Sequence, residues 1–326
     1  METYLVSGAA GFIASFVIDS LLSQGHCVVG VDNMNDAYDV RMKEYRLRKL
    51  MNHGNFIFHR SDITDRSLFT PSSPLQEYKF AAVINLAARA GVRQSVENPW
   101  VYVDTNVTGT LNLLEFCREH GIPKFILAST SSVYGSNAPL PTPETYSSDL
   151  PLQAYAATKK SAEVLCHVYH YLYGLDITVF RYFTVYGPAP RPDMVMFRFA
   201  QWISEGRTVR LNGDGEQSRG FTFVDDIARG TLLGLKPLGY EIINLGGHEV
   251  IKMNDLIRLF ESRIGQKANI EYHPAHPADM TTNWADVGKA RQVLDWEPSI
   301  RLEQGINDLV NWYQQERSWA RDILTP

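Results

Sequence analysis

Short apolar runs alternate with longer amphipathic segments through the first half of the chain, and this pattern limits the possible folds more than any other. Runs such as "AAVINLAA" (81–88) and "KFILAST" (124–130) have the continuous apolar character of strands buried on both faces. Buried strands separated by helices are typical of a parallel sheet covered by helices on both sides. The sequence therefore predicts an α/β fold with a doubly wound parallel sheet. The predicted strands are 3–8, 26–32, 55–62, 81–88, 124–130 and 176–183, and predicted helices include 11–24, 100–120 and 155–173.

A second, smaller lobe is predicted from the change of rhythm after "VYGPAPRPDM" (185–194). Proline and glycine cluster there, and short helices then mix with isolated strands. The segments "FTFVDDIARGTLLGL" and "EIINLGG" are expected to return to the first domain. We therefore expect a first domain of residues 1–186 plus about 221–249, and a smaller α/β C-terminal substrate lobe of 187–220 plus 250–326.

Composition and charge exclude several classes of partner. The chain has 326 residues with a formal net charge of −5 and no basic tract, so we expect no nucleic acid and no membrane surface as a partner. No apolar run reaches the roughly 18 residues that a membrane-spanning helix needs. The three cysteines lack CxxC spacing and the nine histidines lack HxxxH or HxH spacing, so we expect reduced thiols and no metal site. Without a signal peptide at its start, the protein is expected to be cytoplasmic.

The stretch "VSGAAGFIAS" (6–15) follows the first predicted strand and opens the first predicted helix. Gly8 allows the chain to turn, and Gly11 allows the backbone to approach a phosphate group. The helix that follows presents amide donors and a partial positive charge at its N-terminus. Ala14 stands at the third glycine position of the pattern and is small enough for helix–strand packing. The stretch therefore predicts a dinucleotide-binding turn.

The end of the second predicted strand indicates which dinucleotide binds. Asp32 lies there, 24 residues after Gly8, where an acid can accept hydrogen bonds from an adenosine ribose. A carboxylate repels a 2′-phosphate, and "DNMND" (32–36) has no arginine to bind one, so the sequence favours NAD over NADP. The strand ends "SDI" (61–63) and "NLAA" (85–88) fall at the same edge of the sheet and would complete the site.

A tyrosine and a lysine four residues apart mark the predicted chemical end of the site. Tyr155 and Lys159 in "YAATK" share one face at the start of a predicted helix. A lysine ammonium beside a phenol favours the phenolate, so we expect the pKa of Tyr155 to lie below its usual value of about 10. Such a tyrosine can act as a base on a sugar hydroxyl near neutral pH. Without a nucleotide site the same pair would only be part of a solvated helix face.

The combination of "GAAGFIA", Asp32, "NLAA", "STSSVYG" and "YAATK" resembles the extended short-chain dehydrogenase/reductase family. Within it the chain is similar to the nucleotide-sugar epimerases over essentially its whole length, through "FRYFTVYGP" and "SRGFTFVDDIA" to "WADVGKARQVLDWEP". The stretches "DNMNDAYDVRMKEYRL", "ARAGVRQSVENPWVYVDTNVTGT" and "TVYGPAPRPDM" look most like bacterial UDP-glucuronate 4-epimerases. The resemblance implies a Rossmann-type first domain, NAD as cofactor, and a UDP-sugar that is oxidised at C4 and reduced on its opposite face.

The resemblance also implies roles for individual residues. Its catalytic positions are Thr130, Tyr155 and Lys159, and Arg191 in "RPDM" would bind a substrate carboxylate. Thr184 would face the sugar or its phosphates, and Arg219 the diphosphate. The expected substrate-binding residues are thus Ser131, Ser132, Thr184, Arg191, Arg219 and Asp279; the expected cofactor-binding residues are Gly8, Gly11, Phe12, Ile13, Asp32, Asn33, Asp62, Ile63, Leu86, Ala87, Ala88, Tyr155, Lys159 and Tyr182.

A row of hydroxyl residues, Ser129 to Ser132, narrows the expected reaction. In related dehydratases an Asp-Glu pair precedes "VYG", and in glucuronate decarboxylases a glutamate does. Hydroxyls at Ser131 and Ser132 are poor acids and bases, so elimination and decarboxylation are disfavoured. The alternatives to a uronate epimerase are a 4-epimerase of uncharged UDP-hexoses such as UDP-glucose, a UDP-glucuronate decarboxylase, and a non-catalytic NAD-binding regulator.

Four positions depart from the family pattern. Ala14 and Ala278 stand where glycines are usual, and Gly220 replaces an aspartate. Arg89 replaces an uncharged residue and adds a cation near the expected cofactor site, where it could alter substrate preference. Relatives pair the helices 100–120 and 155–173 across a dimer, so a homodimer through these helices is expected.

Overall fold

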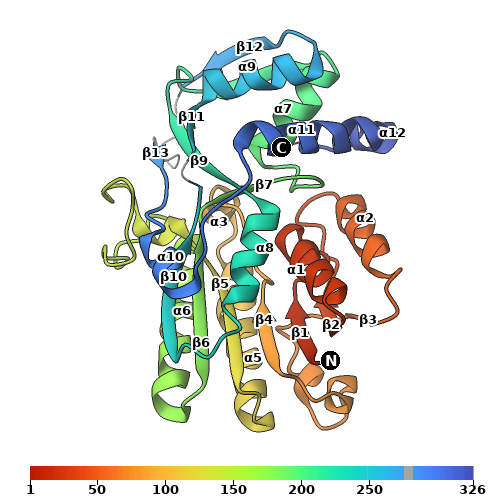
Figure 1. The fold of residues 1–326 in the computed structure, drawn as a ribbon, viewed down its shortest axis with the longest axis vertical. Coiled ribbons are helices and arrows are strands. Elements are labelled where there is room, and N and C mark those ends of the chain that lie inside the picture. The colour runs from red at the N-terminus through yellow and green to blue at the C-terminus, as the bar shows by residue number, and fades with distance from the viewer. Residues whose placement is uncertain (248, 275–281, 326) are drawn as a thin grey trace.

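A seven-stranded sheet forms the core of the molecule, and every neighbouring pair of its strands runs parallel. The computed structural model describes residues 1–247, 249–274 and 282–325. The strand order is β10-β6-β5-β4-β1-β2-β3, so the chain enters at an interior strand and winds toward both edges (Figure 1). The doubly wound parallel sheet predicted from the sequence is confirmed. The strands are β1 (Thr3–Ser7), β2 (Cys27–Asp32), β3 (Phe56–Arg60), β4 (Ala82–Asn85), β5 (Lys124–Thr130), β6 (Asp176–Tyr182) and β10 (Tyr240–Leu245).

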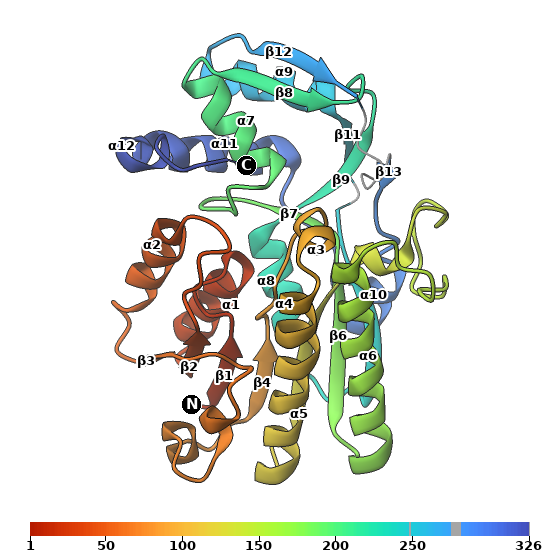
Figure 2. The same ribbon diagram turned by 180° about the vertical axis from the view of Figure 1, so that it is seen from behind.

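Helices cover both faces of this sheet. One face carries α1 and α8, with α2 packed beside α1 (Figure 1), and the other carries α5 and α6 (Figure 2). The strands are buried between these layers, and every residue of β5 is buried, which explains their continuous apolar character in the sequence. None of the helices in the described ranges is both long and apolar enough to cross a membrane. The helices are α1 (Phe12–Ser23), α2 (Val40–Leu50), α5 (Gly109–His120), α6 (Ala154–Tyr173) and α8 (Val224–Leu233).

The predicted helix that contains α5 has a π-helical interior. It begins with α4 (Trp100–Tyr102) and continues through the π-helix η3 (Val103–Thr108) into α5. Asn106 on η3 accepts a hydrogen bond from the Arg89 amide at 2.9 Å and donates one to Thr158 Oγ1 on α6 at 3.0 Å. π turns occur frequently at functional sites. Here the turn connects the loop after β4 to the first turns of α6.

Two smaller sheets lie beyond the carboxyl ends of the large sheet (Figure 1). In the first, β7 and β13 pair parallel with the central strand β9, and β11 pairs with it antiparallel. This sheet joins residues from both sides of the predicted domain division, and the division stays a prediction. The second sheet is the parallel pair β8–β12. The strands are β7 (Thr184–Tyr186), β8 (Thr208–Asn212), β9 (Ser218–Phe223), β11 (Val250–Lys252), β12 (Asn269–His273) and β13 (Thr282–Asn283).

The helices around the smaller sheets bury a continuous apolar interior. Helix α7 packs against both α9 and α11, with Phe197, Phe199 and Phe260 almost fully buried between them. The helices are α7 (Val195–Ser204), α9 (Met253–Ile264), α10 (Gly288–Leu294), α11 (Leu302–Gln315) and α12 (Arg317–Ala320); the short helices of the first half are η1 (Arg66–Phe69), η2 (Pro74–Glu77), α3 (Gln94–Glu97) and η4 (Ser131–Tyr134).

A buried arginine on α2 connects two loops at the carboxyl edge of the large sheet. Arg46 is only 2% exposed, and its Nη1 donates to the carbonyl of Ala10 in the glycine-rich turn at 3.1 Å. Its Nε and Nη2 donate to the carbonyls of Ala189 and Pro190, at 2.9 Å and 3.0 Å. One guanidinium therefore holds the turn before α1 and the loop that leads to Arg191.

Candidate active site

A cavity of about 1200 Å³ lies at the carboxyl ends of the parallel strands and extends to the smaller sheets. Open α/β sheets bind their ligands at this edge. All of the predicted cofactor-binding residues line this cavity, and so do the predicted catalytic residues. Of the predicted substrate-binding residues, Ser131, Ser132, Thr184, Arg191 and Arg219 line it, whereas Asp279 lies outside the described residues.

The glycine-rich turn lines the cavity with backbone that carries no side chain at Gly8 and Gly11. Gly8 has a φ of +71°, and a Cβ there would lie 2.7 Å from the amide nitrogen of Ala87, so only glycine fits. A Cβ on Gly11 would lie 2.8 Å from the Gly8 carbonyl oxygen. Helix α1 begins directly afterwards at Phe12, with its N-terminus at this turn. The turn therefore has the close approach and the amide donors that a dinucleotide diphosphate requires.

The acidic end of the same site is held in place by hydrogen bonds. Asp32 accepts from the amides of Ala10 (3.2 Å) and Met34 (2.8 Å), and its carboxylate lies 3.6 Å from Lys43 Nζ. Each carboxylate oxygen accepts one of these amide bonds and retains lone-pair capacity for a ribose hydroxyl. The residues present thus fit NAD, with its adenosine ribose at Asp32 and its diphosphate at the glycine-rich turn.

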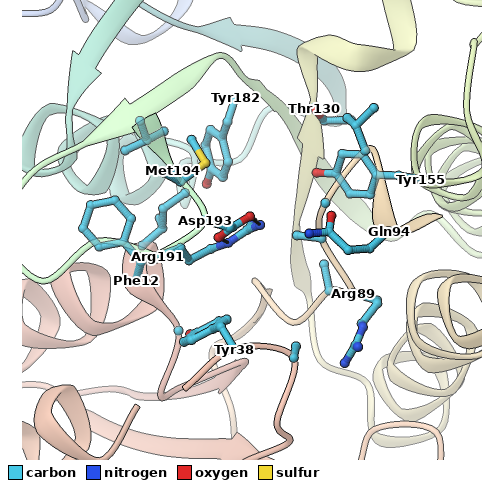
Figure 3. Close-up of a pocket in the computed structure, with 18 of the residues that line it drawn as sticks. Phe12, Tyr38, Arg89, Gln94, Thr130, Tyr155, Tyr182, Arg191, Asp193 and Met194 are labelled. Atoms are coloured by element: carbon cyan, nitrogen blue, oxygen red, sulfur yellow. Dashed lines mark hydrogen bonds and ion pairs between the residues drawn. The ribbon is translucent and has the colours of Figure 1, made fainter. Parts of the chain in front are cut away.

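The catalytic residues predicted from the sequence meet across the end of β5. Thr130 is the last residue of β5, and Tyr155 lies in the first turn of α6 beside it (Figure 3). Burial raises the pKa of the Tyr155 phenol above its ordinary value, although a hydrogen bond with Thr130 and the Arg191 guanidinium oppose the shift. The expectation of a lowered pKa caused by Lys159 was wrong for the protein alone. Desolvation outweighs the Thr130 hydrogen bond and the attraction of the Arg191 guanidinium.

The pKa of Lys159, the buried lysine of this pair, is also shifted. Burial lowers the pKa of Lys159 to about 8, and the carboxylate of Glu163, one helical turn further along α6, limits this decrease. Lys159 therefore loses its charge as the pH rises through about 8 in the protein alone. Its location at the cavity wall still allows it to donate hydrogen bonds to a bound nucleotide.

The row of hydroxyls at the end of β5 divides into separate roles. Ser129 Oγ donates to the buried carboxylate of Glu163 at 2.5 Å and so ties β5 to α6. Thr130 Oγ1 accepts from the Ser132 amide at 3.2 Å and caps the short helix η4. Ser131 Oγ accepts from Asn283 Nδ2 at 3.1 Å, which links the strand end to β13. No carboxylate stands in the row itself.

Arg191, one of the predicted substrate residues, is paired with an acidic side chain of its own loop. Its Nε and Nη2 donate to the two carboxylate oxygens of Asp193 at 3.0 Å and 2.5 Å. The pair lies opposite Tyr155 in the cavity (Figure 3). Thr184 and Arg219 line the cavity from β7 and β9. Nothing in the described residues groups three or more His, Cys, Asp or Glu side chains as a metal site.

Sequence reasoning missed three residues that support the site. Glu163 had a detectable signal, because it follows Lys159 by four positions on one helix face. Asp193 stands inside "RPDM", but only the fold shows that it pairs with Arg191. Asn283 had no local signal, because the fold brings it to Ser131 from a distant part of the chain.

The structure shows the surroundings of three of the four positions that depart from the family pattern. A Cβ on Gly220 would lie 2.7 Å from the Cβ of Trp284 and 2.9 Å from the Gly247 carbonyl oxygen, so an aspartate there would collide with its neighbours. Ala14 is buried in α1, and Arg89 lines the cavity. Ala278 lies outside the described residues.

Comparisons with known proteins identify the family of the chain. A family model described as GDP-mannose 4,6 dehydratase matches residues 5–309. The UDP-glucuronate 4-epimerase of Thermodesulfobacterium geofontis is 54% identical over 324 residues, covering 99% of each chain. A crystal structure of the Bacillus cereus UDP-glucuronic acid 4-epimerase in complex with UDP-glucuronic acid and NAD matches with a TM-score of 0.90 and 36% identity, covering 96% of this chain and 99% of that chain.

A relative that acts on an uncharged sugar has a similar fold. The UDP-glucose 4-epimerase of Thermotoga maritima, in its structure with UDP-glucose, matches with a TM-score of 0.89 and 32% identity. That match covers 97% of this chain and 99% of the other. By sequence and by fold alike, the chain belongs to the NAD-dependent nucleotide-sugar epimerases of the extended short-chain dehydrogenase/reductase family.

Proposed function

We propose that the protein converts UDP-glucuronate to UDP-galacturonate by NAD-dependent epimerisation at C4. The observation that carries this proposal is an arginine opposite the tyrosine base in the same cavity (Figure 3). The Arg191 guanidinium is close enough to Tyr155 to oppose the rise that burial causes in the pKa of its phenol. A guanidinium binds a planar carboxylate through two parallel hydrogen bonds, and a uronate carries that group at C6, next to the reacting end of the sugar.

The chain's own residues supply the proton chemistry. The glycine-rich turn and Asp32 would hold NAD, which would supply a positive charge and a reversible hydride acceptor for C4 of the sugar. Tyr155 Oη removes the proton from the 4-hydroxyl and later gives it back to the 4-oxygen. Thr130 holds the same oxygen in line by a hydrogen bond. Arg191 retains the carboxylate while the 4-keto sugar turns between the two half-reactions.

The hydroxyl row supports epimerisation over other outcomes of the same first step. Neither Ser131 nor Ser132 can remove a proton at neutral pH without a stronger base beside it. Glu163, which accepts a hydrogen bond from the Ser129 hydroxyl of this row, is buried in an ion pair with Arg181. The 4-keto sugar therefore has no acid–base group in the row to drive elimination.

Product analysis with separate substrates tests the proposal. The purified protein with NAD should convert UDP-glucuronate into its C4 epimer, which chromatography separates from the substrate. UDP-glucose should react far more slowly, since it lacks the group that Arg191 binds. Conversion of UDP-glucose alone would favour the hexose epimerase, and a UDP-pentose as main product would favour the decarboxylase. No turnover of any UDP-sugar would favour the NAD-binding regulator.

Replacing Arg191 by alanine should affect a uronate selectively. The loss of a charge-assisted hydrogen bond corresponds to roughly 1.5–3 kcal/mol, so kcat/KM for UDP-glucuronate should fall about 10- to 150-fold. Binding of UDP-glucose, measured by calorimetry, should change little, because it has no carboxylate. Equal losses for both ligands would contradict the role of Arg191 in binding the carboxylate.

We assign the remaining predicted residues on the same basis. The residues that line the cavity from β1, β2, β4 and the loops after them would hold NAD, and Thr184 and Arg219 would contact the UDP-sugar. The first domain would then carry the cofactor and the smaller lobe the nucleotide-sugar. A cytoplasmic location is consistent with the three cysteines, all of which are free.

A homodimer through α5 and α6 is part of the proposal. It is supported by apolar side chains that remain exposed on α6 and on the helical turns that precede α5. Light scattering should give twice the 36.9 kDa chain mass, and replacing Tyr171, which is 79% exposed, by glutamate should give a monomer. Tyr272→Glu, at an exposed site on β12, is the matched control, and a monomeric wild-type protein would contradict the dimer. The exposed residues are Trp100, Val103, Val164, Val168, Tyr171, Leu172 and Tyr173.

A further inference from the structure

The arginine assigned to the substrate carboxylate is already bound by a carboxylate of this chain. Both oxygens of Asp193 accept hydrogen bonds from Arg191, and the two side chains are 15% and 25% exposed. Burial alone would raise the pKa of Asp193, but the Arg191 guanidinium lowers it below its usual value. The pair is therefore ionised at neutral pH, and its two charges cancel.

The turn that carries both residues is well supported. The Arg191 carbonyl accepts from the Met194 amide at 3.2 Å, which closes a turn with Pro192 at its second position. Arg46 holds the carbonyl of Pro190 immediately before it. Arg191 and Asp193 thus project from one short, braced segment, and their pairing does not depend on a distant part of the chain.

The geometry of the pair leaves part of the guanidinium for another ligand. A guanidinium has two edges that can each bind a carboxylate through two hydrogen bonds. Asp193 occupies the edge formed by Nε and Nη2 of Arg191. Within the described part of the chain, Nη1 makes no hydrogen bond, so the edge formed by Nη1 and Nη2 can accept a second carboxylate.

We propose that Asp193 is a positioning residue that fixes the Nε–Nη2 edge of Arg191 and thereby presents the other edge to the substrate carboxylate. This inference rests on the proposed function and adds a specificity determinant to it. Because the charges of Arg191 and Asp193 cancel, the site selects a uronate by the direction of its hydrogen bonds more than by net charge. Electrostatic attraction alone would not need Asp193.

The direction of the hydrogen bonds from Arg191 to the substrate carboxylate matters because the oxidised substrate is a β-keto acid. Breaking the C5–C6 bond leaves its electron pair on C5, conjugated with the C4 carbonyl, and releases CO₂; a proton from solvent then adds to C5. This step requires the C5–C6 bond to stand out of the plane of the carbonyl group. A carboxylate held against one fixed edge of Arg191 keeps that bond near the plane and so protects the intermediate.

The variant Asp193→Asn removes the charge and keeps the shape of the side chain. The share of UDP-glucuronate turnovers that release CO₂ should rise about tenfold or more, as expected for the loss of one charge-assisted hydrogen bond that directs Arg191. Radiolabelled CO₂ and the UDP-pentose measure this share against the epimer. The affinity for UDP-glucose should stay within about threefold of the wild-type value, because no carboxylate is involved. Asp193→Glu, which keeps the charge, should return the ratio toward that of the wild type.

The matched control removes the same charge elsewhere. Glu119→Gln breaks an exposed ion pair with Arg118 near the end of α5 and should leave the product ratio unchanged. An Asp193→Asn enzyme with an unchanged ratio would overturn the inference. If Asp193→Asn binds UDP-glucuronate more tightly and its ratio of CO₂ release to epimerisation is unchanged, Asp193 is instead a counter-ion that the substrate displaces. If the wild-type protein does not epimerise UDP-glucuronate, the proposed function fails first, and this inference with it.

Discussion

Replacing Tyr155 by phenylalanine should abolish most of the epimerisation and leave ligand binding nearly intact. Removing a positioned general base lowers a rate by roughly 10²- to 10⁴-fold. The ring would remain packed at the start of α6, close to Tyr102, so the cavity should keep its shape. We expect kcat for UDP-glucuronate to fall within that range, measured by chromatography of the two epimers, and the calorimetric affinity for the substrate to change only a few fold.

A second tyrosine provides the control for this change. Tyr240 donates its hydroxyl to the backbone carbonyl of Glu163 at 3.2 Å and lies outside the cavity. Tyr240→Phe removes the same atom, and kcat should change less than about threefold, since only one ordinary hydrogen bond is lost. A Tyr155→Phe enzyme that keeps more than about a tenth of the wild-type kcat would show that another group removes the proton.

Replacing Glu163 by glutamine should cost about 3 kcal/mol in the free energy of unfolding. Glu163 lies 2.7 Å from Arg181 Nη2, both side chains are almost fully buried, and the Ser129 hydroxyl donates to the same carboxylate. Removing one partner of a buried ion pair leaves the other charge without compensation, which typically costs about 3–5 kcal/mol. Glutamine still accepts hydrogen bonds, so the lower end of that range applies. Urea denaturation measures the change.

The exposed ion pair between Glu119 and Arg118 is again the comparison. Its loss in Glu119→Gln should cost at most about 1 kcal/mol, because water screens an exposed pair. Equal costs for the two variants would mean that the Glu163–Arg181 pair adds nothing specific to stability. The same experiment also tests the end of β5, because Glu163 accepts a hydrogen bond from Ser129, the residue before Thr130.

The sheet could be predicted because its burial is recorded directly in the apolar runs. The run "AAVINLAA" also shows the limit of that signal, since β4 ends at Asn85. The backbone of Ala87 passes close to Gly8, whose Cβ position would lie 2.7 Å from the Ala87 amide nitrogen. Ala87 and Ala88 both line the cavity, so these two apolar residues belong to the cavity wall and not to the strand. Periodicity alone does not separate these two causes.

The site could be predicted wherever its chemistry is local in sequence. Gly8 and Asp32 belong to short patterns, and the spacing of Tyr155 and Lys159 places them on one helix face. The sign of the Tyr155 pKa shift could not be obtained in this way, because it depends on burial by surrounding elements. The pairing of Asp193 with Arg191 could not be predicted from the sequence either, because it depends on the conformation of a proline turn.

The three carbonyls bound by Arg46 have a consequence for how the two ligands affect each other. One guanidinium braces the turn that receives the dinucleotide and the loop that presents Arg191. If a ligand that orders one loop also orders the other through Arg46, thermodynamic reciprocity requires each ligand to strengthen the binding of its partner by the same factor. A sugar in mid-reaction would thus help to retain the cofactor that must reduce it. Retention of the cofactor suits a reaction in which the oxidation and the reduction at C4 must both occur before the sugar dissociates.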